Sequence, residues 1–373
     1  MSHARRAETM DDRQAWTRRT FLTTVAGAAM LWPLRGAFSQ EDAPLRFLRI
    51  GTASTAGTYF PIGGILANAI SHPPGSRPCE RGGSCGVPNL IAVVQSTDGS
   101  VDNVRRLASG ALDSGLVQSD VAYWAYYGKG LFEDQGPVEN LRAIANLYPE
   151  AVHLVVREDT RVRSVPELAG KRISLDRKGS GTRVDAELIL KAFGMSKDDI
   201  QEVDVPAGQA ADMMREGELD GFFFVAGTPA KAISDLAEDV AIHLLPLFGP
   251  EVVTLREAYP FFAPHSISAG TYQNVAYTQT LSVGAQWIID ASIDEDTVYQ
   301  ITRALWHPNT RRLLDNGHPK GKLIRLETAL DGLGVPLHPG ARRWYVEAGE
   351  IEPDERPGPS EVVPSDSGAA EED

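Results

Sequence analysis

Two loops rich in glycine and hydroxyl residues have the composition of anion-binding loops. They lie within residues 45–69 (LRFLRIGTASTAGTYFPIGGILANA) and 171–193 (KRISLDRKGSGTRVDAELILKAF). In each, a short apolar strand pattern leads through the loop into an amphipathic helix pattern. A helix start leaves backbone N–H groups unpaired and carries the positive end of the peptide dipoles, which favours a carboxylate or phosphate. Glycines allow close approach of the backbone, and hydroxyls add donors.

A second matching pair follows the two loops. Residues 101–113 and 210–220 each read as a helix that ends in Gly-x-Leu-Asp, and apolar strands follow at 114–118 and 221–225. The chain therefore repeats a strand–loop–helix, helix–strand pattern, which predicts two α/β lobes. Because ligands bind at the carboxyl ends of strands in open α/β sheets, we expect a ligand cleft between the lobes.

The predicted ligand-binding residues are the hydroxyl, amide and glycine positions of these loops and strand ends. They are Thr52, Ser54, Gly57, Thr58, Tyr59, Gln95, Ser96, Gln118, Ser119, Gly179, Ser180, Gly181, Thr182, Gly227 and Thr228. The alternative for the loops is an ordinary strand-to-helix turn capped by Thr or Ser. Arg183 either pairs with a carboxylate or lies on a solvated helix face, which we favour slightly. The aromatic cluster between Tyr123 and Tyr127 is interpreted mainly as packing.

The N-terminus has the three parts of an export signal in order. Thr17–Leu22 fits the twin-arginine pattern, an apolar run covers 22–34, and an A-x-A-like site ends at Ser39. We predict a twin-arginine signal peptide at 1–39 and a periplasmic protein. The alternatives are a basic tail with a buried helix, or an uncleaved anchor, although the apolar run is shorter than the roughly 20 residues that span a bilayer.

The two cysteines, Cys79 and Cys85, lie in a loop rich in Pro, Gly and Arg at 71–88. In an exported chain this spacing favours a disulfide that closes the loop. A metal or redox site is the disfavoured alternative, because the two thiols do not form a C-x-x-C. We expect no metal and no cofactor.

The charge balance disfavours nucleic acid as a partner. The chain has a formal net charge of −14, and residues 1–39 contribute six arginines against three acidic residues, so the rest is more negative still. Residues 350–373 contain nine acidic residues and one arginine, and they are predicted to be a disordered acidic tail.

Several motifs together resemble the TAXI family, the extracytoplasmic solute receptors of TRAP-type transporters. They are Ile50-Gly51-Thr52, Gly57 to Gly64, Gly99 to Asn103, Val117 to Ala122, Leu147 to Leu154, Gly179 to Thr182 and Pro336 to Ala341. The resemblance covers residues 45–349. It implies an α/β fold, a two-lobed periplasmic binding protein (type II-like) in which each lobe is a mixed β-sheet flanked by helices. Lobe one is expected at 41–147 plus 248–349 and lobe two at 148–247, with crossings near 148–156 and 244–248.

The function that the resemblance implies is capture of a small organic anion, a carboxylate such as glutamate or a 2-oxo acid, by a monomeric receptor. The receptor would deliver it to the polytopic membrane subunits of a TRAP transporter. A periplasmic sensor that signals to a membrane kinase is the alternative. An enzyme is disfavoured: there is no G-x-S-x-G, residues 51–57 lack the middle glycine of a dinucleotide loop, and 317–322 is one residue short of a P-loop. A hydrolase or transferase on the same scaffold is the remote alternative, and we assign no catalytic residue.

Overall fold

The computed structural model describes residues 44–354. The expected signal peptide at 1–39 and all but the first residues of the acidic tail lie outside the described range. Within that range, none of the helices is both long and apolar enough to cross a membrane.

A mixed sheet of ten strands forms the centre of the described chain. Its order is β4-β1-β5-β12-β6-β9-β7-β8, with β10 paired to β6 and β11 to β12. The strands are β1 (Arg46–Gly51), β4 (Leu90–Gln95), β5 (Ser114–Gln118), β6 (Leu141–Arg157), β7 (Arg172–Ser174), β8 (Gln201–Val203), β9 (Gly221–Ala226), β10 (Ile242–Leu244), β11 (Ala263–Ile267) and β12 (Thr278–Asp290). A separate parallel pair joins β2 (Ser71–His72) to β3 (Val87–Pro88).

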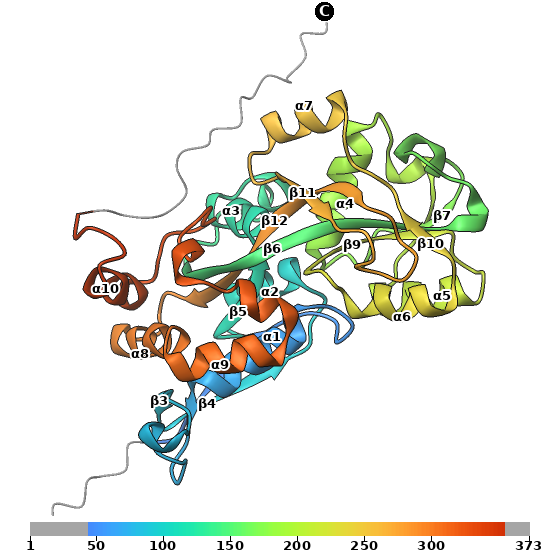
Figure 1. Ribbon diagram of the computed structural model, residues 1–373. Coiled ribbons are helices and arrows are strands. Elements are labelled where there is room, and N and C mark those ends of the chain that lie inside the picture. The colour runs from blue at the N-terminus through green and yellow to red at the C-terminus, as the bar shows by residue number, and fades with distance from the viewer. Residues whose placement is uncertain (1–43, 355–373) are drawn as a thin grey trace, which may run out of the picture. The chain divides into compact units, whose positions relative to one another are not determined.

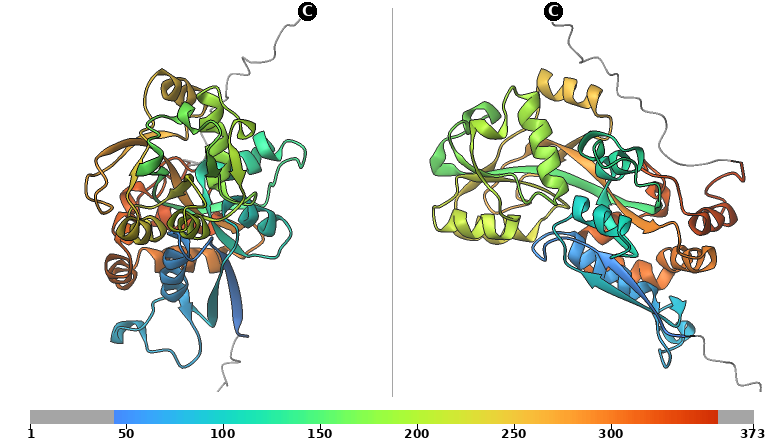
Figure 2. Two further views of the ribbon diagram at one scale, coloured as in Figure 1. Left: turned by 90° about the vertical axis from the view of Figure 1, so that its right-hand side faces the viewer. Right: turned by 180° about the vertical axis from the view of Figure 1, so that it is seen from behind.

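Helices flank the sheet on both faces (Figures 1 and 2). They are α1 (Tyr59–Ile70), α2 (Ser100–Ala108), α3 (Ser119–Tyr127), α4 (Gly181–Ala192), α5 (Ala207–Arg215), α6 (Lys231–Asp239), α7 (Pro250–Ala258), α8 (Glu295–Leu305), α9 (Pro308–Gly317) and α10 (Pro339–Glu347). Beside β9, α4 covers one face and α5 and α6 the other. The reason is alternation along the strand: Phe223 and Val225 pack in the core of α4, and Phe222 and Phe224 in the core of α5 and α6.

Two long strands, β6 and β12, join the parts of the sheet. They pair antiparallel from Asp290 opposite Leu141 to Ser282 opposite Ala151, and β6 is the long green strand through the middle of Figure 1. One core gathers residues 48–148 and 285–351, which we call the first half. Two cores on opposite faces gather residues 151–283, which we call the second half.

The expected fold class, a mixed α/β sheet with flanking helices, is confirmed. Near the expected second crossing, at 244–248, the structure instead has β10, which pairs only with the far end of β6 at Val155–Arg157. The strand that returns to the first half is β12. The lobe boundaries at 147/148 and 247/248 stay a prediction.

The repeated Gly-x-Leu-Asp pattern has one structural role in both places. Gly110 and Gly217 have φ of 71° and 77°, the left-handed conformation that glycine tolerates at the end of a helix. Asp113 then accepts hydrogen bonds from the backbone N–H and guanidinium of Arg49 in β1. Asp220 does the same with Arg172 in β7. Partial burial opposes ionisation, but these hydrogen bonds prevail and lower the pKa of both carboxyls.

We expect Asp113→Ala and Asp220→Ala each to lower the free energy of unfolding by about 1–3 kcal/mol, because each leaves a half-buried arginine without its acceptor. Urea unfolding measures this. The control is Asp159→Ala. Asp159 also accepts two hydrogen bonds from an arginine, Arg157, but its side chain is 65% exposed. It should change stability by less than about 1 kcal/mol. Equal losses in all three variants would contradict the role assigned to the repeat.

Candidate functional site

A cavity of about 240 Å³ lies at the carboxyl ends of strands from both halves. Its walls come from the segments that follow β1, β4, β5, β7 and β8, and from the end of β9. This is the edge at which open α/β sheets bind ligands. The volume equals that of about eight water molecules, which suits a small metabolite.

Nine of the predicted ligand-binding residues line this cavity. They are Ser54, Gly57, Thr58, Tyr59, Ser96, Gln118, Ser180, Gly181 and Thr182. They come from segments far apart in the chain, so the fold brings the two predicted loops to one cavity. Their contact with a solute stays a prediction.

The other six, Thr52, Gln95, Ser119, Gly179, Gly227 and Thr228, are not among the lining residues. Several of them support the walls. The Thr52 hydroxyl donates to the Gln95 carbonyl at 2.8 Å, and Ser119 Oγ accepts from the Gly284 N–H at 3.2 Å. Composition alone does not separate a hydroxyl that faces a cavity from one that ties two strands together.

Four helices begin at the cavity wall. The lining residues include Thr58 and Tyr59 at the start of α1, Gly99 and Ser100 at α2, Ser180 and Gly181 at α4, and Pro206 and Ala207 at α5. The sequence analysis placed the starts of α1 and α4 at the site. It predicted helices at 101–113 and 210–220, but not that α2 and α5 begin at the same cavity. The first-turn N–H groups of a helix have no partner within that helix, so each helix start carries partial positive charge. Four such starts therefore direct positive charge at one small volume.

Gln118, the residue immediately before α3, also lines the cavity, and its side chain links the two halves. Its Nε2 donates to Asp185 Oδ2 of α4 at 2.6 Å, and its Oε1 accepts from Ser100 Oγ at 3.3 Å. Gly181 lies directly against this amide: a Cβ at that position would be 1.5 Å from Gln118 Oε1, so a larger residue would displace the Gln118 side chain from its contacts with Ser100 and Asp185.

The cavity contains acidic residues that the sequence analysis missed. Glu150, at the middle of β6, is buried, and its Oε2 accepts from the Tyr59 hydroxyl at 2.6 Å. Burial raises the pKa of Glu150 to about 8, against the opposing effects of Tyr59 and of Lys320. At neutral pH the carboxyl is therefore mostly protonated and does not repel an anion.

Asp176 and Asp98 face the cavity from opposite halves. Burial raises the pKa of Asp176 to about 6, although the Arg177 N–H and the Ser180 hydroxyl donate to it. Asp98 pairs with the guanidinium of Arg177 at 2.8 Å, with both side chains nearly half exposed. This ion pair crosses from the first half to the second beside the cavity.

Two of these acids lie at places that the sequence marks. Glu150 lies in the Leu147 to Leu154 motif, and Asp176 lies two residues after the end of β7. A composition typical of anion-binding loops, rich in hydroxyl residues and glycine, does not indicate acidic residues at the same strand ends.

Arg183 and the aromatic cluster have structural roles. Arg183 is buried rather than on a solvated face, and its guanidinium pairs with Glu187 at 3.0 Å and Glu202 at 2.6 Å. Tyr123 and Trp124 pack against Phe261, so the packing interpretation is confirmed for them. Neither ring lines the cavity.

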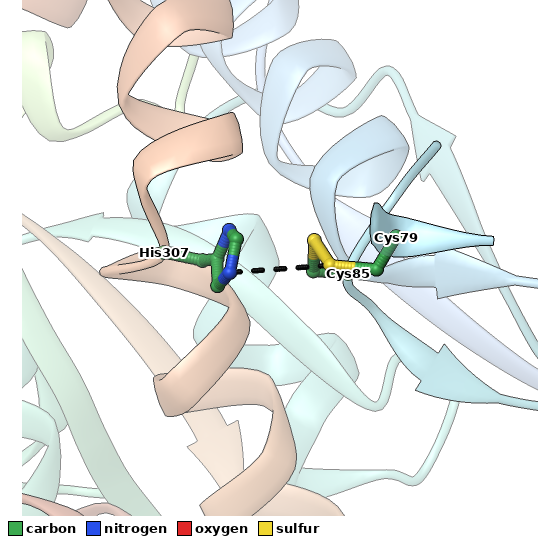
Figure 3. A group of neighbouring side chains, drawn as sticks. All are labelled: Cys79, Cys85 and His307. Carbon is green, nitrogen blue, oxygen red and sulfur yellow. Dashed lines mark hydrogen bonds between the residues drawn. A yellow bond between two sulfur atoms is a disulfide. The ribbon is translucent and has the colours of Figure 1, made fainter. Parts of the chain in front are cut away.

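The predicted disulfide between Cys79 and Cys85 is present (Figure 3). The fold brings a histidine to it: His307, which caps α9, places Nε2 3.9 Å from Cys79 Sγ. The three side chains are the one group of potential metal ligands within the described residues. Because the sulfurs are bonded to each other, they are not the thiolates that bind metals.

A family model shows what the chain belongs to: it is a member of the NMT1-like family, with residues 50–349 matched. The TAXI resemblance is not confirmed by this match. Among solved structures, the alkanesulfonate-binding protein SsuA from Xanthomonas axonopodis pv. citri bound to MOPS is similar at 16% identity and a TM-score of 0.42, over 74% of this chain and 79% of that chain. PhnD1 from Prochlorococcus marinus, in complex with methylphosphonate, is similar at 10% identity and a TM-score of 0.46, over 82% and 99%.

We expect Tyr59→Phe to raise the pKa of Glu150 above about 8, because the Tyr59 hydrogen bond stabilises the ionised carboxylate. Lys320→Met should act in the same direction by removing the opposite charge. A pH titration of carbon-13-labelled glutamate side chains by NMR measures both. Tyr277→Phe, at a tyrosine that is 58% exposed, is the control. An unchanged Glu150 pKa in both variants would mean that water, not these side chains, sets it.

Proposed function

We propose that the protein is an extracytoplasmic solute receptor that captures a small organic anion between its two halves. The observation that carries this proposal is the convergence of four helix starts on one cavity of about 240 Å³. Helix starts bind carboxylates and phosphates through backbone N–H groups and the helix dipole. An acidic protein can hold an anion in this way without surplus basic side chains.

A carboxylate is the anion class that we propose, with glutamate and 2-oxo acids as the candidates. The acids of the cavity favour glutamate. Asp98 is already paired with Arg177, so Asp176 is the acid that would attract an ammonium group, while the neutral Glu150 carboxyl leaves the helix starts free for the carboxylate. A 2-oxo acid has no ammonium group to offset the charge of Asp176.

We propose that the structure has the two halves closed around the cavity, and contacts that join the halves beside it support this. Besides the Asp98–Arg177 pair, the Thr58 hydroxyl donates to the Gly227 carbonyl at 3.3 Å, and the Asp102 N–H donates to the Gly179 carbonyl at 3.0 Å. We propose that solute favours this arrangement because only then do helix starts of both halves contact one anion.

Delivery to the polytopic membrane subunits of a TRAP transporter is the proposed next step, supported by the resemblance to TAXI receptors. A periplasmic location reached by the twin-arginine route belongs to the same proposal, and the disulfide suits an oxidising compartment. Solute uptake into vesicles that contain the membrane subunits tests it. Uptake that does not respond to the receptor would favour signalling to a membrane kinase instead.

A thermal-shift screen of small carboxylates, amino acids, sugars and phosphate esters should show stabilisation by L-glutamate, since a ligand of the folded state adds RT ln(1 + [L]/Kd). Thr58→Val and Ser180→Ala should each weaken glutamate binding by about 1–2 kcal/mol in calorimetry, because each removes a hydroxyl from the cavity wall.

Thr254→Val, at an exposed threonine of α7, is the matched control and should bind like the wild type. A response to sugars alone, or unchanged affinity in both cavity variants, would place the site elsewhere.

A further inference from the structure

Two buried aspartates from different halves meet behind the cavity wall. Asp120 lies in the first turn of α3, whose apolar residues belong to the core of the first half. Asp185 lies in α4, whose apolar residues belong to a core of the second half. Both side chains are 0% exposed.

The two carboxyls interact with each other and have few hydrogen-bond donors around them. The Asp120 carboxyl interacts with the Asp185 carboxyl and with the backbone N–H groups of Asp120 and Val121, and Asp185 Oδ2 accepts from Gln118 Nε2 at 2.6 Å. Among the described residues, no donor in ordinary hydrogen-bond geometry reaches Asp120 Oδ1, Asp120 Oδ2 or Asp185 Oδ1. Two ionised carboxylates buried together in this way would suffer both desolvation and mutual repulsion. One proton held between them removes a charge and provides a donor.

Building on the proposed function, we propose that Asp120 and Asp185 form a proton-binding site that is completed when the two halves close, so that the receptor takes up one proton together with its solute. Asp120 keeps the remaining negative charge, because the first turn of α3 favours it through the helix dipole. Asp185 carries the proton.

Gln118 connects this proton site to the solute cavity. Its amide lines the cavity and contacts Asp185, and Gly181 at the start of α4 packs directly on its Oε1. If α4 moves away from α3, the carboxyls separate and become hydrated. Each then returns toward the ordinary aspartate pKa of about 3.9 and releases the proton at neutral pH.

The burial of the two carboxyls and the charges around them favour one proton bound to the pair. Burial raises the pKa of Asp120 to about 6 and the pKa of Asp185 well above its usual value, and repulsion by the Asp120 carboxylate adds to the rise for Asp185. Glu150 faces the pair from β6 and is itself faced by Tyr59 of α1, by Tyr148 of β6 and by Lys320 of the turn at Pro319–Leu323.

The sign of the pH dependence follows from these raised values. The closed form binds protons more tightly than the open form, so closure is favoured at low pH and weakens as the pH rises through the closed-form pKa of the pair. One linked proton changes the affinity by at most about tenfold per pH unit.

Titration calorimetry with L-glutamate, from about pH 5.5 to 8 and in buffers with different ionisation enthalpies, measures the proton directly. We expect about one proton taken up per glutamate at neutral pH and a Kd that increases with pH. Asp185→Asn mimics the protonated side chain, so it should bind glutamate with no proton uptake and a flat pH profile. Asp120→Asn should also bind glutamate with no proton uptake and a flat pH profile, and it replaces Asp185→Asn in the test if that variant does not fold.

Two controls keep the assignment specific. Asp212→Asn, at an exposed residue of α5 that pairs with Arg215, should retain the wild-type proton uptake. Glu150→Gln changes a buried acid of the cavity wall that is not assigned to the proton site, and it should retain the pH slope even where its affinity differs. Glutamate binding without proton uptake, or uptake that persists in Asp185→Asn and vanishes in Glu150→Gln, would overturn the proposal.

Failure of the proposed solute class would be distinguishable. If glutamate does not bind at any pH, the same proton-uptake measurement is made with whichever compound of the thermal-shift screen stabilises the protein, because the proposed proton site forms only in the closed, liganded form. We expect proton uptake in the wild type and none in Asp185→Asn. Uptake that persists in Asp185→Asn would overturn the proton site independently of the solute class.

Discussion

The antiparallel pairing of β6 with β12 is the constraint on which the rest of the structure depends. These strands are the only two, within the described residues, that carry side chains of both halves' cores, so they fix how the other strands are arranged around the cavity. Glu150 lies on this shared element, opposite Val283. The Glu150 side chain is buried at that position, which explains its raised pKa.

Charge in the cavity is controlled by backbone and burial rather than by basic side chains. Four helix starts provide partial positive charge that needs no counter-ion, while burial keeps Glu150 neutral at pH 7. Arg177 is half exposed and already paired with Asp98, so it contributes more to holding the halves together than to the field inside. The cavity can therefore be favourable to an anion in a chain whose net charge is −14.

Local patterns predicted the local parts of this structure well. The repeat that ends in Gly110 and Gly217 predicted two equivalent helix ends, because a left-handed residue and a following aspartate are short-range requirements. The loops before α1 and α4 were recognised for the same reason. The partners of Asp113 and Asp220 were not predicted, since Arg49 and Arg172 lie 64 and 48 residues earlier in the chain.

What the sequence could not show is which distant polar groups share one buried volume. His307 lies 228 residues from Cys79 and still contacts it, and Asp185 lies 67 residues from Gln118. Neither aspartate of the buried pair stands in a motif for acid chemistry. Their chemistry arises because α3 and α4 meet from different halves with one donor between them. A residue type that is ordinary on each helix acquires the chemistry of a buried acid pair only through the tertiary contact between α3 and α4.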